Sequence, residues 1–366
     1  MSILVTRSSM PPIEEYMEEI RTVFESRWMT NMGTLYKKFQ HQLMNYLEVP
    51  ELSLFVNGHM ALEMAIRAMG LCHEGGEVIT TPFTFVSTIH AITRNNLKPV
   101  FCDIKADDFT MDPEKIEGLI TEKTVAVIPV HVYGNVCEVE AIQEIAQKYK
   151  LKVLYDAAHA FGVTYKGVGV GNFGDASMFS FHATKVFNSI EGGAIAFHDK
   201  KYKMPLHELK NFGIHGQEDS MSVGGNAKLD EFRAAMGICN LRHVKEYIEA
   251  RERVVKRYDE RLEGKQGIKL IRPTVESTPN YAYYPVYFDE KLFGKSRDQV
   301  CNELEKADIY ARKYFYPAVN EMTCYKGQFE LNTPVAHDAS MHVLTLPLYE
   351  GLEMKVVDRI CDIILG

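Results

Sequence analysis

Short runs of hydrophobic residues alternate with longer amphipathic stretches between about residues 50 and 200. Each run is short enough for a single strand, and Val, Ile, Leu and Phe fill neighbouring positions within it. Strands that are hydrophobic along their whole length are typical of a parallel sheet that is covered on both faces. The runs that predict strands are 52–56, 77–81, 99–104, 124–130, 151–156 and 176–181.

The stretches between these runs have the periodicity of helices. Residues 138–150 show hydrophobic side chains on one face, and residues 59–70 show the same pattern. In the latter stretch the hydrophobic face consists of Ala61, Leu62, Ala65, Ile66 and Met69. Because strands alternate with helices, the sequence predicts an α/β fold with a mostly parallel central sheet.

The pattern changes after residue 226. Residues 229–264 predict one long helix with a charged outer face, which leads into a region of short strands and helices. In that region the candidates are a strand at 281–288 and helices at 297–307 and 352–365. We therefore expect an N-terminal arm and helix at 1–30, a large domain at 31–245 and a smaller C-terminal α/β domain at 246–366.

The composition is that of a globular protein with a large core, since 46% of the 366 residues are hydrophobic. The formal net charge of −8 provides no general attraction to nucleic acid or to anionic membranes. No hydrophobic run approaches the roughly 18–20 residues that span a bilayer. The first residues lack the pattern of a signal peptide. We expect neither a nucleic-acid partner nor a membrane partner.

The cysteines are scattered, and no two of them form a C-x-x-C pair. Their spacing suits neither a zinc site nor a disulfide framework. The expected compartment is therefore the reducing cytoplasm. The seven residues are Cys72, Cys102, Cys137, Cys239, Cys301, Cys324 and Cys361.

Candidate chemistry gathers at the carboxyl ends of the predicted strands, where open α/β sheets bind ligands. One strand ends on Asp156, with His159 close behind it, and the next ends beside Ser180 and leads to Lys185. A terminal Asp is equally consistent with the N-cap of a following helix. A lysine in a loop is equally consistent with a solvated charge.

A phosphate site is predicted where strand 52–56 runs into Gly58 and His59 and a helix begins. Glycine lets the backbone approach an anion, and the free N–H groups of a helix N-terminus favour negative charge. The three strand ends thus supply a phosphate cradle, a carboxylate and an amine. Pyridoxal 5′-phosphate needs this set, because its phosphate, its ring nitrogen and its aldehyde bind these three kinds of group.

Three other patterns are interpreted as structural. Gly169–Gly174 match G-x-G-x-x-G, but a strand-like run follows instead of a helix, so we expect turn glycines. Asp156 and His159 have no third ligand at a suitable spacing, so no metal site is predicted. Glu191–Gly193 are expected to form a turn that supports the site.

Five motifs resemble those of the DegT/DnrJ/EryC1/StrS sugar aminotransferases. They are VNGHMALEMAIRA, TTPFTFVSTIHAI, YDAAHAFG, SFHATKVFNSIEGG and GGNAKLDEFRAAMG. The resemblance extends over nearly the whole chain, from WMTNMG to LPLYEGL. It implies a pyridoxal phosphate-dependent architecture of fold type I, and a homodimer with active sites at the subunit interface.

The resemblance also implies roles for single residues. Lys185 matches the lysine that forms the Schiff base and then carries the proton, and Asp156 matches the carboxylate at the ring nitrogen. His159 takes the place of a Gln or His that bonds the ring hydroxyl. Phe85 matches an aromatic residue that stacks on the ring, with Phe83 as the alternative.

Other matches concern the phosphate of the cofactor. Ser180 and the backbone at Gly58 and His59 match phosphate contacts, and Asn226 matches an asparagine that reaches the partner subunit's cofactor. Two positions depart from the family. His59 replaces a Thr or Ser, so only its backbone contact is expected, and Lys228 replaces an arginine without offering the planar bidentate fork.

Family members that are most similar around Lys185 aminate a dTDP-4-keto-6-deoxy-hexose. The resemblance implies that L-glutamate donates the amine and leaves as 2-oxoglutarate, while the cofactor alternates with pyridoxamine 5′-phosphate. A nucleotide-linked keto sugar, with dTDP-4-keto-6-deoxy-glucose as the expected example, then receives the amine for a surface polysaccharide. We expect the sugar pocket near residues 211–216, residues 312–316 and His182.

Three alternatives stay open. A dehydratase branch of the family uses the same cofactor but has a histidine at the lysine position, so Lys185 favours transamination. A second alternative is a regulator that binds ligand without turnover, although Asp156, Ser180 and Lys185 are all present. A cysteine desulfurase-like enzyme would need a mobile catalytic cysteine, and none of the seven is marked by its neighbours.

Overall fold

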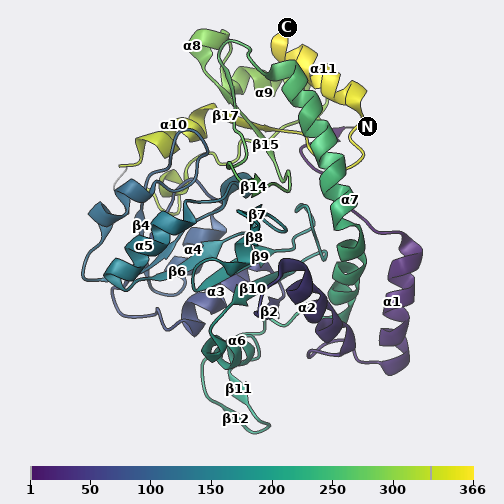
Figure 1. Cartoon of the computed structure of the whole chain (residues 1–366), viewed down its shortest axis with the longest axis vertical. Helices are drawn as coiled ribbons and strands as arrows, with labels where there is room; N and C mark the ends of the chain where they lie inside the picture. The colour runs from purple at the N-terminus through teal and green to yellow at the C-terminus, as the bar shows by residue number, and fades with distance from the viewer. Residues whose placement is uncertain (1, 330–331) are drawn as a thin grey trace.

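The computed structural model describes residues 2–329 and 332–366 and is built around a seven-stranded sheet (Figure 1). The strand order is β2-β10-β9-β6-β5-β3-β4. These strands are β2 (Glu51–Phe55), β3 (Glu77–Thr80), β4 (Lys98–Phe101), β5 (Thr124–Ile128), β6 (Lys152–Asp156), β9 (Ala176–Ser180) and β10 (Gly193–Phe197). All six strands predicted from the hydrophobic runs are present, with ends that differ by a few residues at most.

The sheet is mostly parallel, as predicted, because β9, β6, β5, β3 and β4 run in one direction. The exception is β10, which lies antiparallel between β2 and β9. The hydrophobic pattern does not predict β10, since its residues Gly193, Ala194 and Ala196 lack the branched side chains that mark a strand.

Helices cover both faces of the sheet. One buried cluster packs α2 (Thr34–Leu47), α5 (Val139–Tyr149) and the start of α7 (Glu231–Leu262) against one face. A second cluster packs α3 (Gly58–Ala68), α4 (Ser87–Thr93) and α6 (Lys203–Leu209) against the other. Successive residues of a strand join opposite clusters, for example Val153 and Leu154 in β6. This arrangement explains why hydrophobic side chains occur on both faces of the strands.

The long helix α7 connects two cores. Its 32 residues agree with the prediction of a single helix at 229–264. Ala234 and Ile238 pack in the sheet core, whereas Val254 and Tyr258 pack in a separate C-terminal core. The predicted boundary after residue 245 therefore falls inside a continuous helix, and the division into domains stays a prediction.

The C-terminal core is built on an antiparallel sheet of β13 (Ile268–Leu270), β15 (Tyr284–Phe288) and β17 (Val343–Leu346). The helices α9 (Arg297–Lys306) and α11 (Met354–Leu365) cover it. The N-terminus joins this region, since β1 (Ile3–Leu4) pairs with β16 (Ile309–Tyr310). Figure 1 shows α1 (Ile13–Ser26) lying along α7. The other elements are α8 (Glu290–Phe293), α10 (Pro334–His342), β7 (Thr164–Tyr165), β8 (Val168–Gly169) and β14 (Ser277–Thr278).

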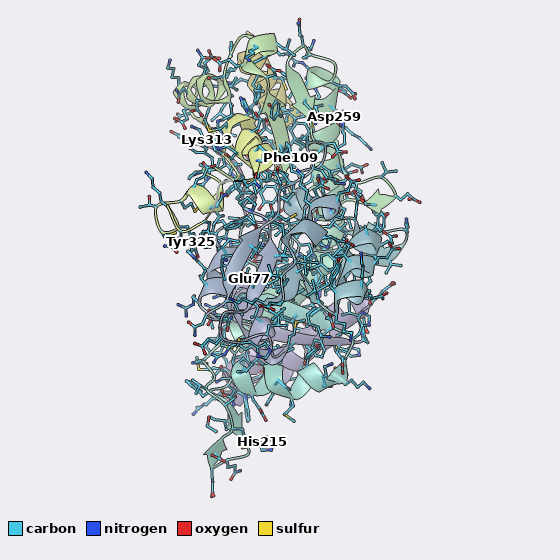
Figure 2. All side chains as sticks on the ribbon, turned by 90° about the vertical axis from the view of Figure 1, so that its left-hand side faces the viewer. Glu77, Phe109, His215, Asp259, Lys313 and Tyr325 are labelled. Atoms are coloured by element: carbon cyan, nitrogen blue, oxygen red, sulfur yellow. The ribbon has the colours of Figure 1, made fainter. Side chains whose placement is uncertain are left out.

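A narrow hairpin of β11 (Ile214–His215) and β12 (Asp219–Ser220) projects from the sheet region. Figure 2 shows His215 on this hairpin, at the opposite end of the molecule from Asp259 in α7. The glycine motif Gly169–Gly174 lies in β8 and a single 3-10 turn and leads into β9, so the prediction of turn glycines is confirmed. Among the described residues, no helix has the length and hydrophobicity to cross a membrane.

Gly237 in α7 allows the helix to lie directly against α2. A Cβ atom at Gly237 would lie 2.3 Å from Cζ of Phe39, whose buried ring packs on Phe181 and Phe187. Overpacking of this kind costs about 1–3 kcal/mol. Replacing a glycine by alanine inside a helix returns about 1 kcal/mol.

Because the 2.3 Å approach is severe, we take the upper end of this cost and expect Gly237→Ala to lower the free energy of unfolding by about 2 kcal/mol, as measured by denaturant unfolding. The control is Gly118→Ala, since no heavy atom lies within 4 Å of a Cβ placed at Gly118. This control should unfold at the same denaturant concentration as the parent protein or at a higher one. Equal stability of both variants would contradict the close packing of α7 on α2.

Candidate active site

The predicted strand ends come together at one edge of the central sheet. Asp156 ends β6, and Ser180 ends the neighbouring strand β9. Gly193 of β10 pairs with Ser180 on one side and with Phe55, the end of β2, on the other. The antiparallel strand thus joins the phosphate-site turn after β2 to the strand that leads to Lys185.

Asp156 is a buried carboxylate with two hydrogen-bond donors. Its Oδ2 accepts from Oγ1 of Thr88 at 2.8 Å, and its Oδ1 accepts from the backbone N–H of Ala158 at 3.1 Å. Burial raises the pKa of this carboxyl, and the two donors and the charge of Lys185 oppose that rise. Residues 157–163 form turns, so the alternative of an N-cap for a following helix is wrong.

His159 is held in one tautomer. Its Nδ1 accepts a hydrogen bond from the backbone N–H of Tyr133 at 3.1 Å, so the ring proton is on Nε2. Burial and the charge of Lys185 hold the pKa of His159 well below its ordinary value. The ring is therefore a neutral donor, and it lines the same small pocket as Lys185.

Lys185 is half-buried and points at a tyrosine from the C-terminal region. Its Nζ donates to Oη of Tyr283 at 3.2 Å and lies 5.7 Å from the centre of that ring. The ring of Tyr283 also meets the ring of His159, with centroids 4.7 Å apart. The alternative of a fully solvated loop lysine does not fit this environment. Sequence reasoning missed Tyr283, because nothing distinguishes it from Tyr281 or Tyr284.

At the predicted phosphate site, the chain segments at Gly58, Ser180 and Gly193 approach one another closely. A Cβ atom at Gly58 would lie 2.9 Å from Cβ of Ser180, and one at Gly193 would lie 2.6 Å from the backbone nitrogen of Gly58. Glycine is required at both positions. Gly58 opens α3, whose first N–H groups have no acceptor within the helix. The structure thus brings Gly58 and Ser180 together, as the phosphate prediction requires.

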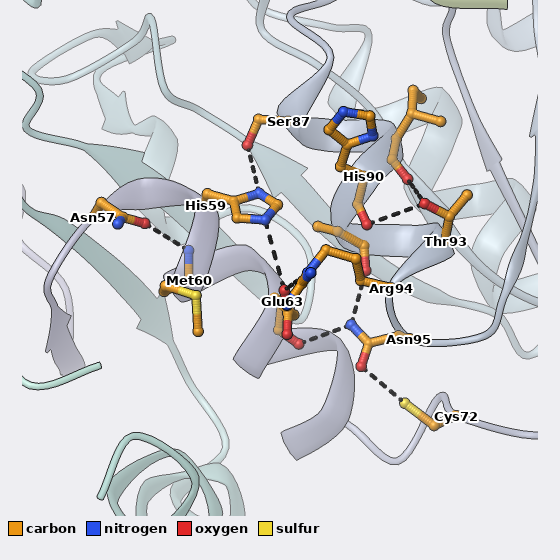
Figure 3. A network of polar contacts seen from close by, with 12 residues as sticks. Asn57, His59, Met60, Glu63, Cys72, Ser87, His90, Thr93, Arg94 and Asn95 are labelled. Atoms are coloured by element: carbon orange, nitrogen blue, oxygen red, sulfur yellow. Dashed lines mark hydrogen bonds and ion pairs between the residues drawn. The ribbon is translucent and has the colours of Figure 1, made fainter. Parts of the chain in front are cut away.

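The His59 side chain turns toward helix α4 (Figure 3). Its Nδ1 lies 2.9 Å from Oγ of Ser87, and its Nε2 lies 3.6 Å from Oε2 of Glu63. Glu63 is in turn paired with Arg94 at 2.7 Å. Burial lowers the pKa of His59. The ring of His59 contacts Ser87 and Glu63, whereas the backbone N–H of His59 lies in the first turn of α3.

The two aromatic candidates lie in different environments. Phe83 is 0% exposed and packs against Phe109, Tyr133 and Phe315. Phe85 is 57% exposed and has a free ring. Phe83 is therefore a core residue, and the stacking prediction stays with Phe85.

Asn226 and Lys228 lie where the projecting hairpin returns to the sheet. Asn226 is exposed, forms a β-bridge with Asn211, and is not among the residues that line the Lys185 pocket. Lys228 donates to Oδ1 of Asn211 at 2.6 Å and covers the ring of Phe212. The predicted role of Asn226 toward a partner subunit stays a prediction.

Gly192 and Gly193 lie where a side chain would clash, and the supporting role of the Glu191–Gly193 segment stays a prediction. A Cβ atom at Gly192 would lie 2.2 Å from Oγ of Ser189, and Gly193 opens β10.

Of the segments expected around the sugar, 312–316 reaches the site, since the Tyr314 ring lies 5.7 Å from that of Tyr283. His182 lies 3.5 Å from Glu191 and bonds Thr184.

The site residues fit pyridoxal 5′-phosphate. They offer a carboxylate at Asp156, a neutral N–H donor at His159, an amine at Lys185 and a glycine-lined helix N-terminus at Gly58. These groups match the cofactor's ring nitrogen, ring hydroxyl, aldehyde and phosphate. Among the described residues, no three His, Cys, Asp or Glu side chains form a group that could hold a metal ion.

Comparisons with known proteins support this interpretation. dTDP-4-amino-4,6-dideoxy-D-glucose transaminase from Escherichia coli is 40% identical over 100% of this chain and 98% of its own length. The structure of DesI in the presence of its TDP-sugar product has a TM-score of 0.95 at 31% identity, and the match covers 100% of this chain and 92% of DesI.

Spr1654 from Streptococcus pneumoniae, whose structures include a PLP form and a PMP form, has a TM-score of 0.92. It is 27% identical, and in the PLP form the match covers 100% of this chain and 98% of Spr1654. The sequence pattern of the DegT/DnrJ/EryC1/StrS aminotransferases matches residues 12–365. The chain therefore belongs to the DegT/DnrJ/EryC1/StrS aminotransferase family, whose members depend on pyridoxal 5′-phosphate.

Proposed function

We propose that the protein transfers an amino group from L-glutamate to a nucleotide-linked keto-deoxy sugar, with dTDP-4-keto-6-deoxy-glucose as the preferred example. The observation that carries the proposal is the half-buried amine of Lys185 beside the buried pair of Asp156 and His159. The choice of sugar rests on the E. coli relative and on DesI, whose names state a dTDP-sugar or TDP-sugar.

Pyridoxal 5′-phosphate, when bound, supplies an aldehyde that condenses with amines and a ring that withdraws electrons from the attached carbon. Asp156 would keep the ring nitrogen protonated, because an ionised carboxylate favours an adjacent cation. The Nε2–H of His159 would donate to the ring hydroxyl oxygen. The first turn of α3 and Ser180 would bind the phosphate, and the exposed ring of Phe85 would stack on the cofactor.

Lys185 would hold the cofactor and then move protons. Its Nζ takes the proton from Cα of L-glutamate and, in the second half of the cycle, delivers a proton to the sugar carbon that carries the new amine. General acid–base catalysis needs a group within reach of the proton that it moves, here at Cα of L-glutamate and at the sugar carbon. The hydrogen bond to Oη of Tyr283, at 3.2 Å, orients Nζ when it is free.

The site is proposed to be completed by a second copy of the chain. The projecting hairpin and its flanking residues, 211–226 in all, expose large hydrophobic side chains that a monomer would leave in water, including Phe212, Met221 and Val223. Asn226 at its base is free to reach a partner. A homodimer in which the hairpin contacts the other subunit's cofactor phosphate explains both features.

Two further parts of the proposal concern the setting. All seven cysteines lie among the described residues and none is in a disulfide, which fits a reducing cytoplasm. Surface polysaccharide is the proposed use of the amino sugar.

The dehydratase alternative is opposed by Lys185, since that branch has histidine at this position. The regulator alternative is opposed by the complete set of cofactor-binding groups.

The substrate proposal is tested with a panel of nucleotide keto sugars. The enzyme is first treated with L-glutamate, which should convert the cofactor to the pyridoxamine form and change its visible spectrum. Adding dTDP-4-keto-6-deoxy-glucose should restore the original spectrum faster than GDP-linked or UDP-linked keto sugars do. Failure of every keto sugar to restore it would rule out sugar transamination.

The role of Lys185 is tested by Lys185→Ala. We expect loss of the visible absorption band that reports the covalent bond to the cofactor, and a fall in kcat of about 10²–10⁴-fold, the range of general acid–base catalysis. Lys201→Ala is the control, because Lys201 is paired with Asp199 on the surface. Normal turnover by the purified Lys185→Ala variant would refute the assignment.

The dimer is tested by placing charges on the hairpin. The parent protein should sediment at twice the chain mass of 41.7 kDa. The double variant Met221→Glu with Val223→Glu should sediment as a monomer, because burying two unpaired carboxylates at an interface is unfavourable. The control is Val275→Glu, since Val275 is 82% exposed, as Val223 is at 81%, but lies outside the hairpin. A monomeric parent protein would contradict the proposal.

A further inference from the structure

Two buried threonines form a chain of hydroxyl groups that ends on Asp156. Oγ1 of Thr88, in the first turn of α4, lies 2.8 Å from Oδ2 of Asp156. Oγ1 of Thr84 lies 2.9 Å from Oγ1 of Thr88. Both threonines are buried, so bulk water does not compete for these bonds.

The direction of these hydrogen bonds follows from counting protons. The Thr88 hydroxyl has one hydrogen, and two of its neighbours only accept: Oδ2 of Asp156 at 2.8 Å and the carbonyl of Phe85 at 3.2 Å. The hydrogen goes to Asp156, because the bond is shorter and the acceptor is charged. Thr84 must then donate to Thr88. The chain of donation runs from Thr84 through Thr88 to the carboxylate.

This chain answers a physical difficulty at Asp156. A carboxylate in a buried position is pushed toward its neutral form, which cannot hold a proton on a ring nitrogen. Asp156 has two donors among the described contacts, and Thr88 is the one that supplies a side-chain hydroxyl. The bond from Thr88 restricts the rotation of the carboxyl group, and the carboxylate keeps lone pairs that can accept from a further donor.

We infer that Thr88 is the positioning residue for Asp156, and that Thr84 fixes the Thr88 hydroxyl in its donating direction. The inference rests on the proposed function, since it gives Asp156 its role at the cofactor ring. Thr88 acts through Asp156 and does not itself touch the reacting atoms. The sequence offered no signal for it, because TTPFTFVST contains four threonines with no difference in pattern.

The segment that contains Thr88 also contains two other residues near the site, Ser87 and Phe85. The preceding residue Ser87 bonds His59 at the start of α3, at 2.9 Å (Figure 3). Phe85, the candidate for stacking on the ring, lies one turn earlier in the same segment. One short segment therefore contacts helix α3, which begins at the predicted phosphate site, through Ser87 and contacts the carboxylate of Asp156 through Thr88.

The decisive experiment uses Thr88→Val, which keeps the shape of the side chain and removes the hydroxyl. The holoenzyme is prepared with cofactor labelled with ¹⁵N in the ring, and the ¹⁵N chemical shift is followed against pH. Without Thr88 the carboxylate is a weaker partner for the protonated ring nitrogen. We expect the nitrogen to lose its proton at a lower pH than in the parent protein. We also expect kcat to fall about tenfold or more, as for a lost hydrogen bond to a charged group, with KM for both substrates unchanged.

Three variants separate positioning from a purely structural role. Thr88→Ser should restore the parent ¹⁵N titration and most of kcat, because it returns the hydroxyl. Thr84→Val should shift the titration less, and should add nothing in the Thr88→Val background. Thr93→Val, in the same helix, removes a hydroxyl that bonds Ile89, His90 and Tyr325 and should leave the titration unchanged.

A parent-like ¹⁵N titration in Thr88→Val, or an equal effect of Thr93→Val, would overturn the inference. A lower kcat without a shifted titration would overturn it too. If Thr88→Val does not fold, as judged by circular dichroism, Thr84→Val and Thr88→Ser still decide the question. Failure of the parent enzyme with every keto sugar would instead count against the proposed function, and the ring-nitrogen titration would still report on Thr88.

Discussion

The proposed function depends on keeping one charge, the carboxylate of Asp156, ionised in the interior of the protein. Burial raises the pKa of this carboxyl, whereas hydrogen bonds and a nearby positive charge from the surrounding structure lower it. Thr88, the backbone of Ala158 and Lys185 provide these from three different elements. Helix α4, the turn after β6 and the loop after β9 thus all interact with this one carboxylate.

The antiparallel strand β10 joins the predicted phosphate site after β2 to β9, the strand that leads to Lys185. Because β10 runs antiparallel to both β2 and β9, its first residue lies beside the last residues of these two strands. With β10 between them, Gly193 lies against the turn after β2 and also against Ser180. Because Gly193 has no side chain, it can lie close to the backbone of Gly58, and any other residue at this position would push the two segments apart.

Much of this arrangement could be predicted from sequence, and the remainder has physical reasons for escaping prediction. Buried strands such as β5 and β6 are recognisable because hydrophobic residues follow one another without interruption, at 125–128 in β5 and at 153–155 in β6. β10 escaped because glycine and alanine give no strand signal. Phe83 and Phe85 are identical in type and two residues apart, so only burial separates them. Tyr283 lies 98 residues from Lys185, and no local pattern reports a contact across that separation.

The helix α7 also limits how the protein can move. Its 32 residues pack into both hydrophobic cores, and β1 ties the N-terminus to the C-terminal region as well. A hinge between the two cores would have to break the backbone hydrogen bonds of a regular helix, which disfavours opening by rotation of one half against the other. We therefore expect substrates to gain entry through small displacements of rings such as Tyr283 and Tyr314, with the scaffold rigid throughout the catalytic cycle.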